Sequence, residues 1–169
     1  MDSKYISELT QEEKLSFIKI FCKLINIDNN VEKEEIEFLK LIAGRYGVPG
    51  NVVVEVIRAN KSIDHKAEAR KITNRQHALE LIKEMCVLAN VDNEVGDNEL
   101  DMIVDVAEAA GIEDEKVLLI NRWVLDSAIV LKTGNAAPIA TPTNKTAVLI
   151  EDEDFIIFLA SASSLQTAF

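Results

Sequence analysis

Two stretches of this chain repeat one another. Residues 17–48 read FIKIFCKLINIDNNVEKEEIEFLKLIAGRYGV, and residues 81–112 read LIKEMCVLANVDNEVGDNELDMIVDVAEAAGI. They align without a gap at an offset of 64 residues, and 11 of the 32 pairs are identical: Ile18/Ile82, Lys19/Lys83, Cys22/Cys86, Leu24/Leu88, Asn26/Asn90, Asp28/Asp92, Asn29/Asn93, Val31/Val95, Glu35/Glu99, Ala43/Ala107 and Gly47/Gly111. Such self-similarity predicts two copies of one structural unit.

Each copy is predicted to be a helix, a short acidic loop and a second helix, because its apolar residues recur at helical spacing on both sides of the loop. The predicted elements of the first copy are a capping box of Thr10 and Glu13, a helix to about Ile27, the loop 28–31, a helix from about residue 32 to Tyr46, a left-handed Gly47 and a third helix opened by Pro49.

The second copy predicts the same order of elements. They are a capping box of Thr73 and Gln76, a helix over about residues 74–91, the loop 92–95, a helix over about 97–110, a terminal Gly111 and a last helix from Glu113 to about Lys132. Residues 62–72 join the two halves and have room for a short helix.

The predicted fold class is all-α, an antiparallel helix bundle built from two tandem helix–loop–helix repeats with approximate internal two-fold symmetry. Only 6 glycines and 3 prolines occur in 169 residues, which favours long helices over a turn-rich β fold. The helical domain is predicted over residues 1–132. Residues 133–169 are predicted to be a linker and a C-terminal tail, and the sequence leaves open whether that tail forms a strand or a docking helix.

The formal net charge of −11 makes nucleic acid an unfavourable partner, because nucleic-acid binding depends on clustered Lys and Arg. An acidic surface instead suits cations or a protein partner with a basic surface. No signal peptide opens the chain, and no apolar run is long enough to span a bilayer, which favours a cytoplasmic location. Cys22 and Cys86 lie in apolar helical runs and are predicted to be buried, reduced thiols.

Four carboxylates of the repeated loops are the candidate site: Asp28, Glu35, Asp92 and Glu99. Helical geometry places Glu35 and Glu99 on the core-facing side of their helices. One interpretation is structural, with each Glu accepting from free backbone N–H groups in a first helical turn and each Asp closing its loop. The other is a hard divalent cation, Ca²⁺, Mg²⁺ or Mn²⁺, held by carboxylate and carbonyl oxygens.

A second acidic feature is the stripe Asp97, Asp101, Asp105 and Glu108, which is predicted to face solvent or a basic partner. Catalysis is not expected. His65 and His77 are the two histidines and are not spaced as metal ligands, and neither a phosphate-binding glycine loop nor a nucleophile motif occurs.

The duplicated pattern of a helix, an Asp with a short turn and a helix opening in Glu resembles the bacterial tellurite-resistance TerB family and its TerB-like relatives. The resemblance covers about residues 10–132 and includes Asp28 with Glu35 and Asp92 with Glu99. It implies an α bundle of seven helices or a similar number, a role in tellurite or general stress resistance, and metal binding by the acidic residues. The chain departs from the family pattern at Asn29 and Asn93, where glycine is common, and at Glu32 and Gly96, where Ser or Asp is common.

The function expected from these observations is a non-enzymatic TerB-like module with a divalent cation as its possible ligand. The alternative is a metal-free protein–protein interaction domain of the co-chaperone type. The cation-binding module and the metal-free interaction domain can be distinguished, because divalent cations should affect only the first. A third, weaker alternative is a metal-dependent enzyme, which would need an open pocket lined by carboxylates.

Overall fold

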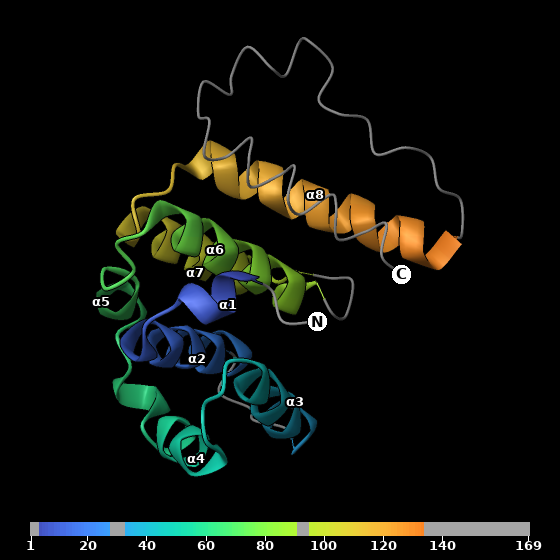
Figure 1. Cartoon of the computed structure of the whole chain (residues 1–169). Coiled ribbons are helices and arrows are strands. Elements are labelled where there is room, and N and C mark those ends of the chain that lie inside the picture. Colours follow the sequence, from blue (N-terminus) through green and yellow to red (C-terminus); the bar gives the residue numbers. More distant parts are fainter. Residues whose placement is uncertain (1–3, 28–32, 91–94, 134–169) are drawn as a thin grey trace.

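Helices form all of the regular structure in the part of the chain that the computed structural model describes, residues 4–27, 33–90 and 95–133. In chain order they are α1 (Lys4–Glu8), α2 (Gln11–Ile25), α3 (Lys33–Arg45), α4 (Gly50–Arg58), the 3-10 helix η1 (Asn60–Ser62), α5 (His65–Ala69), α6 (Arg75–Ala89), α7 (Asp97–Ala109) and α8 (Asp114–Thr133). The prediction of an all-α bundle is confirmed (Figure 1). The predicted tail lies outside the described residues.

The two copies of the repeat have the same secondary structure. Helices α2 and α6 are each 15 residues long, and α3 and α7 are each 13 residues long. Both pairs begin and end at positions that differ by the 64 residues of the sequence alignment, since Gln11 corresponds to Arg75 and Lys33 to Asp97. The helix–loop–helix prediction is therefore confirmed for the described elements. The approximate two-fold symmetry that would relate the copies stays a prediction.

The two α2–α3 and α6–α7 units also end in the same way. Gly47 and Gly111 have backbone φ angles of 69° and 76°, in the left-handed region that favours glycine. Beyond each glycine, the next amide returns to the last helical turn: Val48 N donates to the Ala43 carbonyl at 2.9 Å and Ile112 N to the Ala107 carbonyl at 2.8 Å. This bonding satisfies carbonyls that the helix leaves free, and it confirms the predicted C-terminal glycines.

The predicted capping box at the start of α2 is confirmed. The Glu13 amide donates to Thr10 Oγ1 at 3.1 Å, and the Thr10 amide donates to Glu13 Oε2 at 2.8 Å. The predicted box of Thr73 and Gln76 is wrong. Asn74 caps α6 instead, and its Oδ1 accepts from the amides of Gln76 at 2.8 Å and His77 at 3.2 Å. An asparagine directly before the first helical residue reaches these amides, and Thr73 stands one residue too early.

Helix α1 was not predicted, because five residues are too few to show a helical period. It forms through tertiary contacts, since Tyr5, Ile6 and Leu9 are buried against the bundle. The Tyr5 hydroxyl lies 2.8 Å from the Tyr46 hydroxyl of α3 and donates to Glu84 Oε1 of α6 at 3.2 Å. Burial raises the pKa of both tyrosines far above the ordinary value, so both hydroxyls stay protonated.

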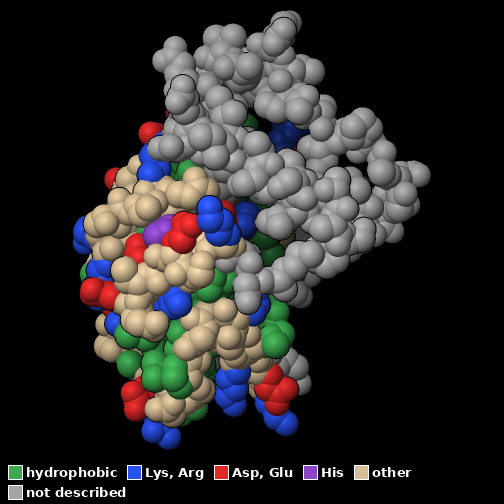
Figure 2. All heavy atoms as spheres, viewed as in Figure 1, with side chains coloured by type: hydrophobic (Ala, Val, Ile, Leu, Met, Phe, Trp, Pro, Cys, Tyr) green, Lys and Arg blue, Asp and Glu red, His purple; other side chains and the backbone are tan. Residues whose placement is uncertain are grey.

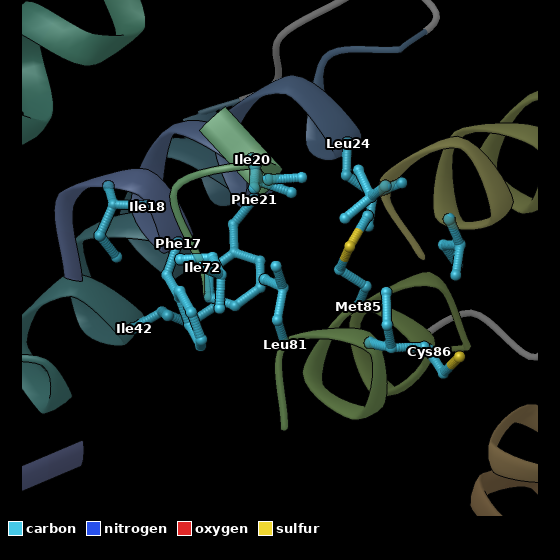
Figure 3. Close-up of a cluster of buried hydrophobic side chains, with 14 of the residues drawn as sticks. Phe17, Ile18, Ile20, Phe21, Leu24, Ile42, Ile72, Leu81, Met85 and Cys86 are labelled. Carbon is cyan, nitrogen blue, oxygen red and sulfur yellow. The ribbon is translucent and has the colours of Figure 1, made fainter. Parts of the chain in front are cut away.

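Helices α2 and α6 form the centre of the bundle, and α6 packs against α2, α7 and α8. Phe17, Ile18 and Phe21 of α2 are almost completely buried, as the apolar residues at helical spacing predict. From α6, Leu81 and Met85 reach toward the same core (Figure 3). Each such side chain contributes about 1.5–3 kcal/mol of burial free energy.

Both cysteines are buried and unpaired with one another, as predicted. Burial raises the pKa of Cys22 to about 11 and that of Cys86 to about 12. On the surface, acidic and basic side chains are interspersed with apolar ones over the face shown in Figure 2. None of the described helices is both long and apolar enough to cross a membrane.

Candidate functional site

The acidic loops are only partly included in the described residues. Asp28 and Asp92 lie outside the described residues. Glu35 belongs to α3, but its side chain is not among those that the structure describes. Glu99 is the predicted ligand whose side chain is described. Among the described side chains, no three His, Cys, Asp or Glu residues gather as a metal-ligand group. Because three of the four predicted ligands fall outside that set, the cation site stays a prediction.

The Glu99 carboxylate lies in the first turn of α7, which begins where the second acidic loop ends. Its Oε2 accepts from the Gly96 amide at 2.8 Å. Gly96 has no side chain to complete a capping box, so the contact is one half of that motif. Glu99 is half-buried rather than directed into the apolar interior. The structural interpretation is thus confirmed for this glutamate, and the carboxylate is held beside the loop.

The acidic stripe of α7 is exposed to solvent, and one of its members forms ion pairs. Asp97, Asp101 and Glu108 are exposed, but Asp105 faces α5. Its Oδ1 lies 2.8 Å from Lys66 Nζ, and its Oδ2 lies 3.5 Å from His65 Nε2. The hydrogen bond from Lys66 lowers the pKa of Asp105, and the contact with His65 lowers it further. The predicted solvent-facing position is confirmed for Asp97, Asp101 and Glu108. Asp105 also keeps 42% of its side chain exposed, while it pairs with cations of α5 that no pattern within α7 indicates.

A cavity of about 360 Å³ lies beside this ion pair, between the end of α2, η1, α5 and α7. Its walls carry both charge signs and several amides. They comprise Lys23, Asn26, Ile27, Asn60, Lys61, His65, Asn98, Asp101, Met102 and Asp105. The volume falls at the lower end of the range of small-molecule pockets in proteins. The cavity joins residues more than 80 positions apart, so sequence reasoning did not find it.

Asparagines end the first helices of the two units, with Asn26 buried and Asn90 partly buried. Asn26 Nδ2 donates to the Cys22 carbonyl and Asn90 Nδ2 to the Cys86 carbonyl, each at 2.7 Å. In both, the amide oxygen is buried and lacks a hydrogen-bond partner. An unsatisfied buried acceptor costs roughly 1–3 kcal/mol. Asn26 and Asn90 are identical in the alignment of the two repeats, and that identity could have indicated them as candidate residues from the sequence alone.

Other ionisable groups of the interior are paired in structural contacts. Glu68 of α5 accepts from Ser16 Oγ and from Lys19 Nζ of α2, each at 2.8 Å. Glu13 and His77 form a buried pair, with 3.0 Å between Oε1 and Nδ1. A carboxylate only accepts hydrogen bonds, so Nδ1 of His77 carries the proton when Glu13 is ionised. Both histidines therefore have carboxylate partners within the fold.

Comparison with protein families matches residues 14–121 to the family model described as tellurite resistance protein TerB. The match spans α2 to α8 and contains both acidic loops. Comparisons with curated proteins and with solved structures gave no match. The family match covers both copies of the repeat and agrees with the all-helical fold. The chain therefore belongs to the tellurite resistance protein TerB family.

Proposed function

We propose that this protein is a non-enzymatic, cytoplasmic TerB module that binds a hard divalent cation through its two acidic loops in a bacterial response to tellurite or other stress. The proposed ligands are Asp28 and Glu35 in the first unit and Asp92 and Glu99 in the second. Ca²⁺, Mg²⁺ and Mn²⁺ are the candidate cations, because they prefer carboxylate, carbonyl and water oxygens.

The position of Glu99 carries the proposal. Its hydrogen bond from the Gly96 amide places a half-buried carboxylate at the junction of the second loop and α7. Asp92 precedes Glu99 by seven residues in the sequence, and the first unit repeats that spacing at Asp28 and Glu35. Only Oε2 of Glu99 is used by the cap, so the other carboxylate oxygen can serve as a cation ligand.

The second candidate function is a metal-free interaction domain. Phe38 and Leu41 on α3 are 38% and 66% exposed, although both are large and apolar. Figure 2 shows hydrophobic side chains on the surface of the lower part of the molecule, where α3 and α4 lie in Figure 1. The net charge of −11 favours a protein partner with a basic surface around such a contact.

Thermal unfolding in millimolar Ca²⁺, Mg²⁺ and Mn²⁺ distinguishes these functions. A cation at one hundred times its dissociation constant stabilises the folded state by about 2.7 kcal/mol. For a domain of this size, the melting temperature should rise by about 2–4 °C per kcal/mol. The double substitution Glu35→Gln with Glu99→Gln keeps side-chain shape and an oxygen acceptor for the Gly96 amide, and it should abolish the rise.

The matched control is Glu55→Gln with Glu115→Gln, which removes the same charge from two exposed positions of α4 and α8. This control should keep the cation response. A melting curve that no cation shifts would contradict the cation proposal and favour the interaction domain. A shift that survives the Glu35 and Glu99 substitutions would also contradict the assigned ligands, and it would direct attention to residues 97–108 or 151–154.

A further inference from the structure

We propose that the cavity between α2, η1, α5 and α7 binds a small zwitterion that carries an ammonium group and a carboxylate, as free amino acids do. Glu99, the proposed cation ligand whose side chain is described, is not among the described residues that line this cavity. The inference rests on the hydrogen-bonding groups that the cavity wall leaves unused and on the two signs of charge around it.

The unused buried groups of the wall are oxygen acceptors. Asn26 is 5% exposed, and its Nδ2 is held by the Cys22 carbonyl, which fixes its Oδ1 as the atom without a partner. Asn60 Oδ1 is likewise buried and lacks a partner. Asp101 adds a carboxylate that forms no ion pair with a described residue. An ammonium group has three donors and no acceptor, and it therefore matches this set of oxygens.

The lysines of the cavity wall indicate that the ligand also carries a carboxylate. Asp105 is already paired with Lys66 from outside the cavity, which leaves Asp101 as the uncommitted carboxylate. Lys61 is exposed and forms no ion pair with a described residue, and Lys23 Nζ donates to the Asn60 carbonyl at 3.4 Å. Two lysines would repel a ligand with only positive charge. They attract one that also carries a carboxylate.

Ligand entry requires a small side-chain movement. The side-chain oxygens of Asn26 and Asn60 each expose less than 1 Å². Lys23 donates to the backbone carbonyl of Asn60 and leaves the Asn60 side chain unbound, so this side chain, which lines the cavity, can turn its amide oxygen toward a ligand. A ligand ammonium that enters satisfies an acceptor that the folded protein otherwise leaves unpaired, and that gain favours the bound state.

The test is titration of the ¹⁵N-labelled full chain with each of the twenty common amino acids, followed by amide and Asn side-chain resonances. The matched fragments are n-butylamine, which has only the cation, and acetate, which has only the anion. We expect at least one amino acid to shift the resonances of Asn26, Asn60 and Asp101 saturably. The two fragments should bind at least about tenfold more weakly, because each loses one charge-assisted contact.

Two substitutions at exposed cavity residues test the assignment without disturbing the core. Asp101→Asn and Lys61→Gln should each weaken binding by about tenfold or more. The controls Glu108→Gln on α7 and Lys40→Gln on α3 remove the same charges outside the cavity and should change affinity by less than about twofold. Folding of every variant is checked by its melting temperature.

Saturable binding that depends on Asp101 and Lys61 supports the proposal. It is overturned if none of the amino acids binds, if binding is the same in Asp101→Asn and Lys61→Gln as in the controls, or if n-butylamine binds as tightly as the amino acids. The result is also independent of the cation proposal, because the variant with Glu35→Gln and Glu99→Gln should retain amino-acid binding while losing the cation response.

Discussion

At the scale of single residues, the buried Glu13–His77 pair joins the start of α2 to the first turn of α6. Glu13 accepts from His77 Nδ1 at 3.0 Å and from the Thr10 amide at 2.8 Å. Burial raises the pKa of Glu13, but the hydrogen bonds from His77 and Thr10 outweigh it and leave the pKa below its usual value. The ionised carboxylate is therefore part of what stabilises this contact.

The sign of the resulting pH dependence follows from linkage. A carboxyl with a folded-state pKa below its unfolded value stabilises the protein above the unfolded pKa of about 4.5, and loses that contribution as pH falls through the folded value. Glu13→Gln should lower the unfolding free energy by about 1.5–3 kcal/mol at pH 7. The difference from the unsubstituted protein should shrink as pH falls below 4.5.

Urea unfolding between pH 3 and pH 7 measures this difference. Glu55→Gln, at an exposed position of α4, is the control and should change stability by less than about 0.5 kcal/mol throughout. A Glu13→Gln difference that stays constant down to pH 3 would show that the carboxylate charge does not contribute. Burial raises the pKa of Glu68, but hydrogen bonds from Lys19, Ser16 and Lys71 outweigh it and leave the pKa below its usual value. Acid should therefore destabilise the Glu13→Gln and Glu55→Gln variants alike through Glu68.

At the scale of elements, the start of α6 shows how one residue decides where a helix begins. Asn74 Oδ1 accepts from two amides that the helix leaves free, those of Gln76 and His77. Asn74→Ala should therefore destabilise the protein by about 1 kcal/mol. Thr73→Ala, at the exposed neighbouring position, should change stability by less than about 0.5 kcal/mol.

Chemical denaturation of the two variants in parallel measures both effects. Equal losses for Thr73→Ala and Asn74→Ala would contradict the assignment of Asn74 as the cap. Thr73 and Asn74 are adjacent and both exposed, so the two substitutions differ mainly in the hydrogen bonds that they remove.

At the scale of the whole molecule, the two cysteines report on whether the repeats unfold together. Cys22 in α2 and Cys86 in α6 both have no exposed surface, and burial raises their pKa values to about 11 and about 12. Since α2 and α6 pack against one another in one core, neither thiol can reach solvent unless the centre of the bundle opens. Both thiols should therefore be unreactive in the native protein.

Maleimide labelling followed by mass spectrometry of peptides measures each thiol separately. We expect both to react slowly in the native protein, at matching rates, and rapidly above the unfolding transition. Rapid native labelling of both would contradict their burial. A large difference between the rates would instead show that one repeat opens without the other, and that the central core is not a single cooperative unit.

The sequence by itself determined the features that depend on neighbouring residues. The gapless repeat predicted the equal lengths of α2 and α6 and of α3 and α7. The Thr10–Glu13 cap and the two left-handed glycines follow from residues within one turn of a helix end. Burial of the cysteines follows from apolar spacing along one helix. The repeat also selected the four carboxylates of the proposed cation site, of which Glu99 lies where a capping glutamate should.

The tertiary structure alone decided which distant groups meet. Helix α1 is too short to be stable without the core that buries Tyr5 and Ile6. Asp105 is paired by Lys66 and His65 from α5, about 40 residues earlier in the chain. The cavity forms only where α2, η1, α5 and α7 pack together. The same packing buries the side-chain oxygens of Asn26 and Asn60, which then lack a hydrogen-bond partner. A periodic pattern records which face of a helix is buried, but not which other side chains lie against it.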